Sequence, residues 1–369
     1  MKKIIFISCL LIASNSMFSQ NNASKVEEKV DSFIVKQMKD LKIPGLAVAI
    51  IKDGKILKKS VYGFANIEWQ TKVTEHSNFQ IASCTKLLTS TLLLKIIYNH
   101  KIDLEESIGN YLDSIPSEWR KIKIKNLISH SSGLPDFYDS ELYLNTRKIV
   151  EQLKSKALLF EPGSKDQYGS SDFMLLSYIL ERIYKNPFVQ ILKDEVTTPL
   201  SMNDGAYDME YKVEGRFMRT IRVNEKVTTY YDYEGTLVNY KFLYPQYTYS
   251  AGGYFASIDD MTNWAIGLDN SKLFPIEFAN EFIYDSDKIG EKDAGFSKVG
   301  WVLENENEVL YGGHSGGPGL GDVLRFPKEK ITIITLSNDG ELLPGLSRVI
   351  ANWYIKGLSA KFKVEKFDR

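Results

Sequence analysis

Cysteine is almost absent from this chain of 369 residues, which has only Cys9 and Cys84. Residues 1–20 begin with Lys2 and Lys3, continue as a short apolar run and end in small and polar residues, a pattern typical of a secretory signal peptide. Removal of this segment leaves Cys84 alone, so the mature chain has no possible internal disulfide and depends on its packed core. We therefore expect an exported protein, either periplasmic or secreted.

A net charge of one sign is also missing. The chain has 46 basic and 47 acidic residues, a formal net charge of -1, and no long block of like charge. Nucleic acids and anionic surfaces are usually bound by basic patches, so the composition favours neither as a partner. We expect a small-molecule or peptide substrate, no transmembrane segment in the mature chain, and a monomer. The sequence also lacks repeats and low-complexity linkers.

Histidine is scarce and is not spaced as a metal ligand. The 4 histidines are His76, His100, His130 and His314, far apart in the sequence. Zinc sites usually contain pairs of His or Cys that lie a few residues apart in the sequence. The sequence therefore predicts no metal and no cofactor, and His130, in "SHSSGLP", is expected to order a loop.

Both ends of the chain have the pattern of β-strands. The segment "IPGLAVAIIKDGKILKKSVYGFAN" contains two β-rich runs around Asp53 and Gly54, a strong hairpin signal. The C-terminal part has a strand meander followed by a helix-like run, whereas the middle consists mostly of helical runs and loops. We predict an α/β (α+β) fold in which both chain ends form one antiparallel sheet flanked by helices. Its domains are residues 21–85 with 286–369, and an inserted, mostly helical domain at 86–285.

The stretch "FQIASCTKLLTS" places Ser83 three residues before Lys86 in an apolar run. At the start of a helix, these two side chains lie on the same face and meet. An ammonium among apolar residues is disfavoured, so Lys86 can act as a base for the hydroxyl, and helix N-terminal N–H groups can stabilise an oxyanion. Alternatively, Ser83 only caps the helix and Lys86 extends to solvent. The motif alone does not decide between these interpretations.

Two further motifs accompany the first. "YGSSDFMLLSYIL" contains Tyr168, and "GHSGGPG" contains His314, Ser315 and Gly316. With three motifs in this order, the chain resembles the serine β-lactamase and penicillin-binding protein superfamily, most closely its class C β-lactamase and D-alanyl-D-alanine carboxypeptidase branch. The resemblance runs through nearly the whole mature chain and implies a β-lactamase/transpeptidase-like fold from a bacterial source.

The resemblance also implies catalytic roles. Ser83 would be acylated by a carbonyl substrate, Lys86 would accept its proton, and Tyr168 would share the role of base. The backbone N–H groups of Ser83 and Gly317 would form the oxyanion hole.

By the same resemblance, Ser170, His314, Ser315 and Gly316 would contact the substrate. Ser170 stands where the family commonly has asparagine. His314 replaces the lysine common in class C β-lactamases, so we expect the positive charge of the site to depend on pH near neutrality. Both departures weaken a β-lactamase assignment and leave peptidase, amidase and esterase activity open.

Two rival nucleophiles are weaker. Cys84 would point about 100° around the helix from Ser83. Ser315 lies in a Gly-x-Ser-x-Gly sequence, but no histidine follows it and the next residues indicate a turn and a strand instead of a helix.

The sequence thus predicts an exported serine hydrolase that forms an acyl-enzyme on Ser83 and cleaves an amide, peptide or ester, for example one with a D-amino acid derived from a cell wall. The alternatives are a true class C-type β-lactamase and a non-hydrolytic penicillin-binding or sensor protein.

Overall fold

A computed structural model of the chain describes residues 25–137, 143–219, 223–240, 242, 244–317 and 320–367. The predicted signal peptide, residues 1–20, lies outside the described residues. Among the described helices, none has the length and apolar character needed to cross a membrane.

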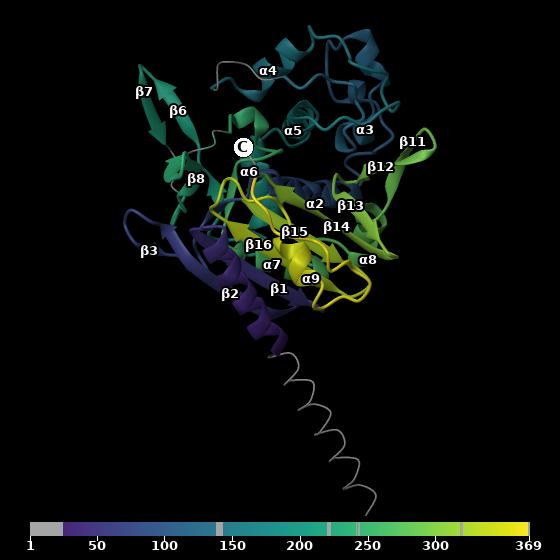
Figure 1. The fold of residues 1–369 in the computed structure, drawn as a ribbon. Helices are drawn as coiled ribbons and strands as arrows, with labels where there is room; N and C mark the ends of the chain where they lie inside the picture. Colours follow the sequence, from purple (N-terminus) through teal and green to yellow (C-terminus); the bar gives the residue numbers. More distant parts are fainter. Residues whose placement is uncertain are drawn as a thin grey trace, which may run out of the picture.

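One large antiparallel sheet dominates the described part of the chain (Figure 1). Its nine strands follow the order β11-β12-β13-β14-β15-β16-β1-β2-β3. Their bounds are β1 Gly45–Lys52, β2 Lys55–Asn66, β3 Thr71–Lys72, β11 Ser286–Ile289, β12 Lys292–Ser297, β13 Val302–Glu306, β14 Val309–Gly316, β15 Gly321–Phe326 and β16 Ile331–Ser337. Strand β1 pairs with β2 on one side and with β16 on the other, which confirms that both chain ends build the same sheet.

The hairpin between β1 and β2 forms where the sequence predicts it. Asp53 and Gly54 have φ angles of 50° and 69°, the left-handed conformation that tight hairpin turns require.

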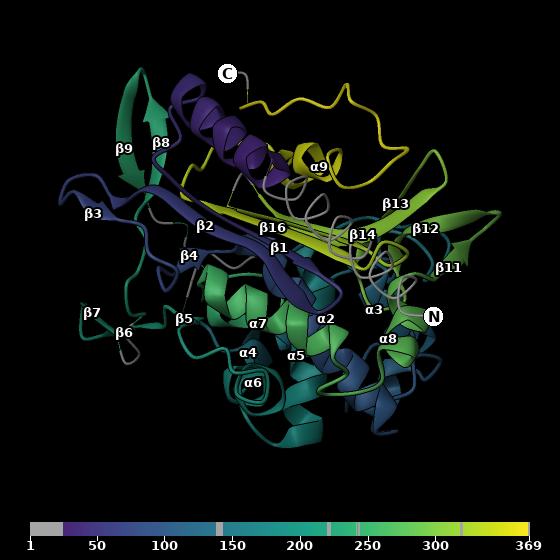
Figure 2. The same cartoon turned by 90° about the horizontal axis from the view of Figure 1, so that it is seen from below.

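Helices cover both faces of this sheet (Figure 2). Leu46, Val48 and Ile50 of β1 pack with a helix at residues 25–40 and with α9 (Leu346–Ala351). The intervening alanines and Ile51 join the larger core, which includes α2 (Thr85–Tyr98) and α7 (Ile258–Asp269). Because both faces are covered, β1 is a continuous apolar run instead of an alternating one.

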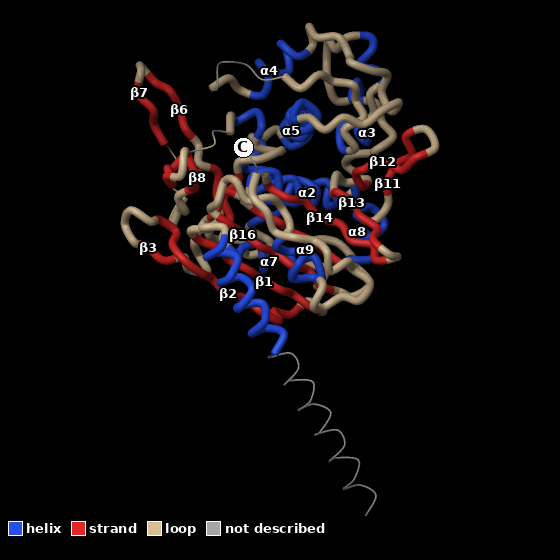
Figure 3. The backbone as a smooth tube through the Cα atoms, viewed as in Figure 1, coloured by secondary structure: helices blue, strands red, loops and turns tan. Residues whose placement is uncertain are grey.

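The middle of the chain contains helices and also more strands than we predicted (Figure 3). The remaining helices are α3 Ile124–Ile128, α4 Thr146–Leu153, α5 Ser170–Tyr184, α6 Phe188–Leu192 and α8 Ile276–Ile283. The additional strands are β4 Phe79–Gln80, β5 Ala206–Tyr207, β6 Glu210–Val213, β7 Arg216–Arg219, β8 Thr229–Tyr233, β9 Thr236–Tyr240 and β10 Tyr254–Ala256. They form three small sheets, β4-β10-β5, β6-β7 and β8-β9, in the described residues.

The extra strands follow from local composition, since threonine and tyrosine favour extended backbone and are frequent between residues 206 and 256. The fold class is confirmed, and "mostly helical" understates the β content of the insert. The domain boundaries at 85/86 and 285/286 stay a prediction.

Candidate active site

Ser83 lies in a strained turn between β4 and α2. It is the middle residue of the short 3-10 helix η1 (Ala82–Cys84). The preceding Ala82 has a φ of 45°, a left-handed conformation that costs about 1–3 kcal/mol for a residue with a side chain. The turn is fixed from both sides: the Ile81 N–H donates to the Tyr254 carbonyl at 3.0 Å, and the Thr85 hydroxyl donates to the Ala82 carbonyl at 2.7 Å.

Lys86 lies one turn into this helical segment and is only 2% exposed. Its Nζ donates to Tyr168 Oη at 2.8 Å and to the carbonyl oxygen of Ala251 at 2.9 Å. The distance from Nζ to Ser83 Oγ is 3.5 Å. The two side chains of the first motif therefore share one face of the helix, as the spacing predicts. Lys86 does not extend to solvent, which excludes the alternative interpretation of the motif.

Tyr168 completes a triangle with these two residues. Its hydroxyl donates to Ser83 Oγ at 3.1 Å, and the residue is 48% exposed, so solvent reaches the site from this side. The residue before it is anchored by a 2.8 Å hydrogen bond from the Gln167 N–H to the carbonyl of His130. The His130 ring packs against the Tyr168 ring, with centroids 4.6 Å apart.

The groups that contact the Lys86 ammonium are neutral. No ion pair involves Lys86 among residues that the structure describes, and its three N–H bonds face oxygens of Tyr168, Ala251 and Ser83. The rings of Tyr168 and Phe173 add cation–π contacts, with Nζ 4.9 Å and 5.2 Å from their centroids.

Strand β14 borders the nucleophile through backbone contact. A Cβ on Gly316 would lie 2.1 Å from the carbonyl oxygen of Ile81, so only glycine lets the strand come this close. This approach carries the backbone of the following Gly317 toward the turn that contains Ser83. An oxyanion hole from the N–H groups of Ser83 and Gly317 stays a prediction that this arrangement favours.

His314 also belongs to β14, and the expectation that its charge changes near neutrality is wrong. The side chain is 6% exposed. Burial, and next the nearby ammonium of Lys86, lower the pKa of His314 to about 3. His314 is therefore uncharged across the neutral range.

Ser315 and Ser170 are less closely tied to the triangle. Ser315 pairs with Asp322 across the strands and lines a cavity of about 190 Å³ with Gly345 and Arg348. Ser170 is the first residue of α5, where its backbone N–H donates to Asp136 Oδ1 at 2.8 Å. Substrate contacts by Ser170, Ser315 and Gly316 stay predictions.

Cys84 is directed away from the triangle. Its thiol is fully buried and donates to the carbonyl oxygen of His314 at 3.1 Å. Burial raises the pKa of Cys84 well above its usual value, which disfavours the nucleophilic thiolate. This geometry supports Ser83 over its neighbour.

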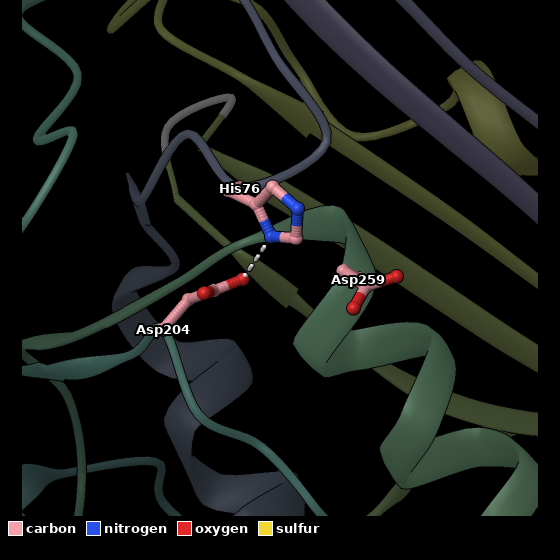
Figure 4. A group of neighbouring side chains, drawn as sticks. All are labelled: His76, Asp204 and Asp259. Carbon is pink, nitrogen blue, oxygen red and sulfur yellow. Dashed lines mark hydrogen bonds and ion pairs between the residues drawn. The ribbon is translucent and has the colours of Figure 1, made fainter.

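His76, Asp204 and Asp259 form the one group with metal-ligand character that was found in the described ranges (Figure 4). Its carboxylates already have partners: Asp204 accepts from His76 Nδ1 at 2.9 Å and from Ser257 at 2.7 Å, while Asp259 pairs with Lys59 at 2.6 Å. We interpret this group as a polar tie between segments that flank the small sheet β4-β10-β5.

We compared the sequence and the fold of this chain, with its serine, lysine and tyrosine beside a glycine-containing strand, with those of known proteins. The sequence profile of the Beta-lactamase family matches residues 30–351. The chain belongs to the Beta-lactamase family. Membership confirms the superfamily and the fold class that the three motifs indicate.

One curated relative illustrates how far the sequence of this chain has diverged within the family. Protein flp of Staphylococcus aureus (strain MW2) is 22% identical over 338 residues, which cover 87% of this chain and 65% of that protein. This member of the family therefore spans slightly less than two thirds of the length of that curated relative.

Two solved structures show the same fold. The D-amino acid amidase from Ochrobactrum anthropi SV3, complexed with L-phenylalanine, superposes with a TM-score of 0.69 and 19% identity over 91% of this chain and 95% of the amidase. EstCE1, described as a hydrolase with promiscuous acyltransferase activity, gives a TM-score of 0.67 and 18% identity over 88% of this chain and 95% of its own. At these identities, the likeness concerns the fold alone.

Sequence reasoning missed three groups around the triangle. The Ala251 carbonyl holds Lys86, and the Phe296 ring stacks on Tyr168 with centroids 5.9 Å apart. His130 orders its loop as expected, but it also supports Tyr168 and contacts the buried Asp172 at 3.0 Å. The sequence does not show which backbone carbonyl will contact Lys86. The stretch "SHSSGLP", in contrast, could have indicated a role for His130 near the site.

Proposed function

We propose that this protein is a serine hydrolase that forms an acyl-enzyme on Ser83 and cleaves an amide, a peptide or an ester. The observation that carries the proposal is the triangle of Ser83, Lys86 and Tyr168, with sides of 2.8, 3.1 and 3.5 Å. A hydroxyl becomes a useful nucleophile when a base lies within hydrogen-bond reach and a third group orients that base.

The distances favour Tyr168 as the immediate base. Tyr168 Oη is 3.1 Å from Ser83 Oγ, closer than Lys86 Nζ at 3.5 Å. All three N–H bonds of the Lys86 ammonium have acceptors, so its role is to stabilise negative charge on Tyr168.

Tyr168 first releases its hydroxyl proton to solvent, which reaches this side of the site, and the Lys86 ammonium stabilises the resulting phenolate. In the acylation step, the Ser83 hydroxyl proton then moves to the phenolate oxygen while Ser83 Oγ attacks the carbonyl carbon. The substrate oxygen gains negative charge, which the backbone N–H groups of Ser83 and Gly317 stabilise. Tyr168 then returns the proton to the leaving amine or alcohol. In deacylation, the Tyr168 phenolate takes a proton from water while the water oxygen attacks the acyl carbon. Tyr168 then returns that proton to Ser83 Oγ as the ester bond breaks, which releases the acid and restores the phenolate.

The proteins that share the fold or the sequence suggest a substrate class. An amidase and a hydrolase with acyltransferase activity share the fold. A curated relative that matches 54% of this chain with 26% identity is an N-acetylmuramyl-L-alanine amidase of Bacillus subtilis (strain 168). We therefore favour an amide or peptide with a D-amino acid or cell-wall origin, acted on by an exported enzyme in the periplasm or outside the cell.

The test is a time course with the purified mature protein, a Ser83→Ala variant and a Cys84→Ala control. Each is mixed with a chromogenic ester, a D-alanyl-D-alanine peptide and a chromogenic cephalosporin, and intact mass is recorded throughout. We expect turnover by the parent and by Cys84→Ala, and none by Ser83→Ala. Persistent acyl mass without turnover identifies a penicillin-binding or sensor protein, and equal behaviour of the parent and Ser83→Ala refutes the mechanism.

A further inference from the structure

A second cavity lies where helices α4, α5 and α6 pack next to one another (Figure 2). Its volume is about 420 Å³, within the range of about 300–1,000 Å³ that is usual for small-molecule sites. Glu181 and Lys185 line it at the end of α5 that is opposite to Tyr168, and the 15 residues of this helix span about 22 Å. Ser83, Lys86 and Tyr168 are not among its lining residues. The cavity is therefore separate from the catalytic triangle.

Two cationic side chains reach this cavity from different helices. Arg147 belongs to the first turn of α4, and Lys185 directly follows the last residue of α5. Both residues are exposed, and neither side chain has a hydrogen bond or an ion pair with a residue that the structure describes. A guanidinium and an ammonium that lack an acidic partner favour an anion, and a carboxylate fits the planar guanidinium with two hydrogen bonds.

The rest of the cavity indicates what else the anion carries. The inner wall is apolar, with Phe188 only 2% exposed, Tyr249 3% exposed and Met209 half-buried. Glu181 supplies an acceptor: its Oε1 accepts from the Phe188 N–H at 3.0 Å, and its Oε2 has no hydrogen-bond partner in the described part of the chain. Burial raises the pKa of Glu181, which weakens its repulsion of an anion.

We propose that this cavity is a second binding site, for a small organic carboxylate that also carries an N–H group and an apolar group, as an N-acylated amino acid does. The carboxylate pairs with Arg147 and Lys185. The N–H donates to Glu181 Oε2, and the apolar group packs on Phe188 and Tyr249. This inference goes beyond the proposed function and does not depend on it, because it concerns binding away from Ser83.

Calorimetric titration of the mature Ser83→Ala protein tests the site without turnover of the probe. The probe is N-benzoylglycine, an achiral carboxylate with an amide N–H and a phenyl ring. N-benzoylglycinamide lacks the charge, N-acetylglycine lacks the ring, and benzoyloxyacetate has an oxygen in place of the N–H. We expect affinity to fall by about tenfold or more without the charge or the ring, and by about fivefold without the N–H.

Substitutions of the two cations show whether the probe occupies this cavity. In the Ser83→Ala protein, Arg147→Gln and Lys185→Gln should each weaken N-benzoylglycine binding by about tenfold and leave N-benzoylglycinamide binding nearly unchanged. Lys148→Gln is the matched control, because it removes the same charge from an exposed residue of α4 that does not line the cavity. Solvent and salt screen that charge, so its removal should change the affinity by less than about twofold.

Methionine methyl resonances locate the probe independently of its affinity. Met209 lines the cavity, whereas Met38 packs against the core on the α9 side of the large sheet. A Met209→Leu variant assigns the resonance of Met209 by its loss. We expect N-benzoylglycine to shift the Met209 methyl resonance and to leave that of Met38 unchanged.

Three outcomes would overturn the inference. They are an unshifted Met209 resonance at millimolar N-benzoylglycine, equal affinity with and without Arg147→Gln and Lys185→Gln, and a loss of affinity in Lys148→Gln as large as theirs. Each of them leaves the proposed hydrolase function standing, since that function is decided by turnover that depends on Ser83. If Ser83-dependent turnover fails instead, the titration and the Met209 resonance still decide whether this second site exists.

Discussion

The close approach of β14 to the nucleophile gives a prediction with a magnitude. In Gly316→Ala, the new Cβ would lie 2.1 Å from the Ile81 carbonyl oxygen, whereas Cβ atoms essentially never come closer than 3.0 Å. Backbone must therefore shift by about 0.9 Å, the difference between these two distances. A displacement of this size between catalytic groups costs about 10²-fold in rate. Overpacking also costs about 1–3 kcal/mol of stability.

Gly317→Ala is the matched control for this experiment. In the part of the chain that the structure describes, nothing lies within 4 Å of a Cβ added at Gly317, and the N–H of the expected oxyanion hole remains. The assay compares kcat/KM for a chromogenic ester with the midpoint of urea unfolding. We expect a large loss in Gly316→Ala and a small one in Gly317→Ala. Full activity in Gly316→Ala, or an equal loss in both variants, would refute the argument from close approach.

Two further predictions concern buried charges. Lys86→Met removes an ammonium that lacks a carboxylate partner among the described side chains, so we expect kcat to fall by about 10²–10⁴-fold while the melting temperature stays equal or rises. A matching loss of melting temperature would show that Lys86 is structural. Burial raises the pKa of Asp322 from 3.8 to about 6. The folded state therefore binds a proton at Asp322 more tightly than the unfolded state does. The free energy of unfolding should then fall as pH rises from about 4 to about 6. This decrease in the free energy of unfolding is about 3 kcal/mol. Asp322→Asn should abolish it when urea unfolding is measured across this pH range. An unchanged pH profile in the variant would show that Asp322 does not cause the decrease.

Much of the fold was predictable because local signals and global topology agree. Asp53 and Gly54 set a hairpin by turn chemistry alone, and the apolar runs of β1 and β16 required burial on both faces. The β strands between residues 206 and 256 were missed because their short runs of tyrosine and threonine have no clear alternation.

For the candidate site, the sequence by itself determined that Ser83 and Lys86 share a face, because three residues make almost one helical turn. It also indicated Tyr168, His314 and Gly317 through the order of the motifs. Only the tertiary structure decided what these residues experience. It placed the Ala251 carbonyl on Lys86 and pressed Gly316 against Ile81. It also buried His314 beside the Lys86 ammonium, and both effects lower the pKa of His314. An exposed histidine would titrate near pH 7, whereas this one stays neutral. Charge state depends on burial and on neighbours from distant parts of the chain, and these are properties of the folded molecule.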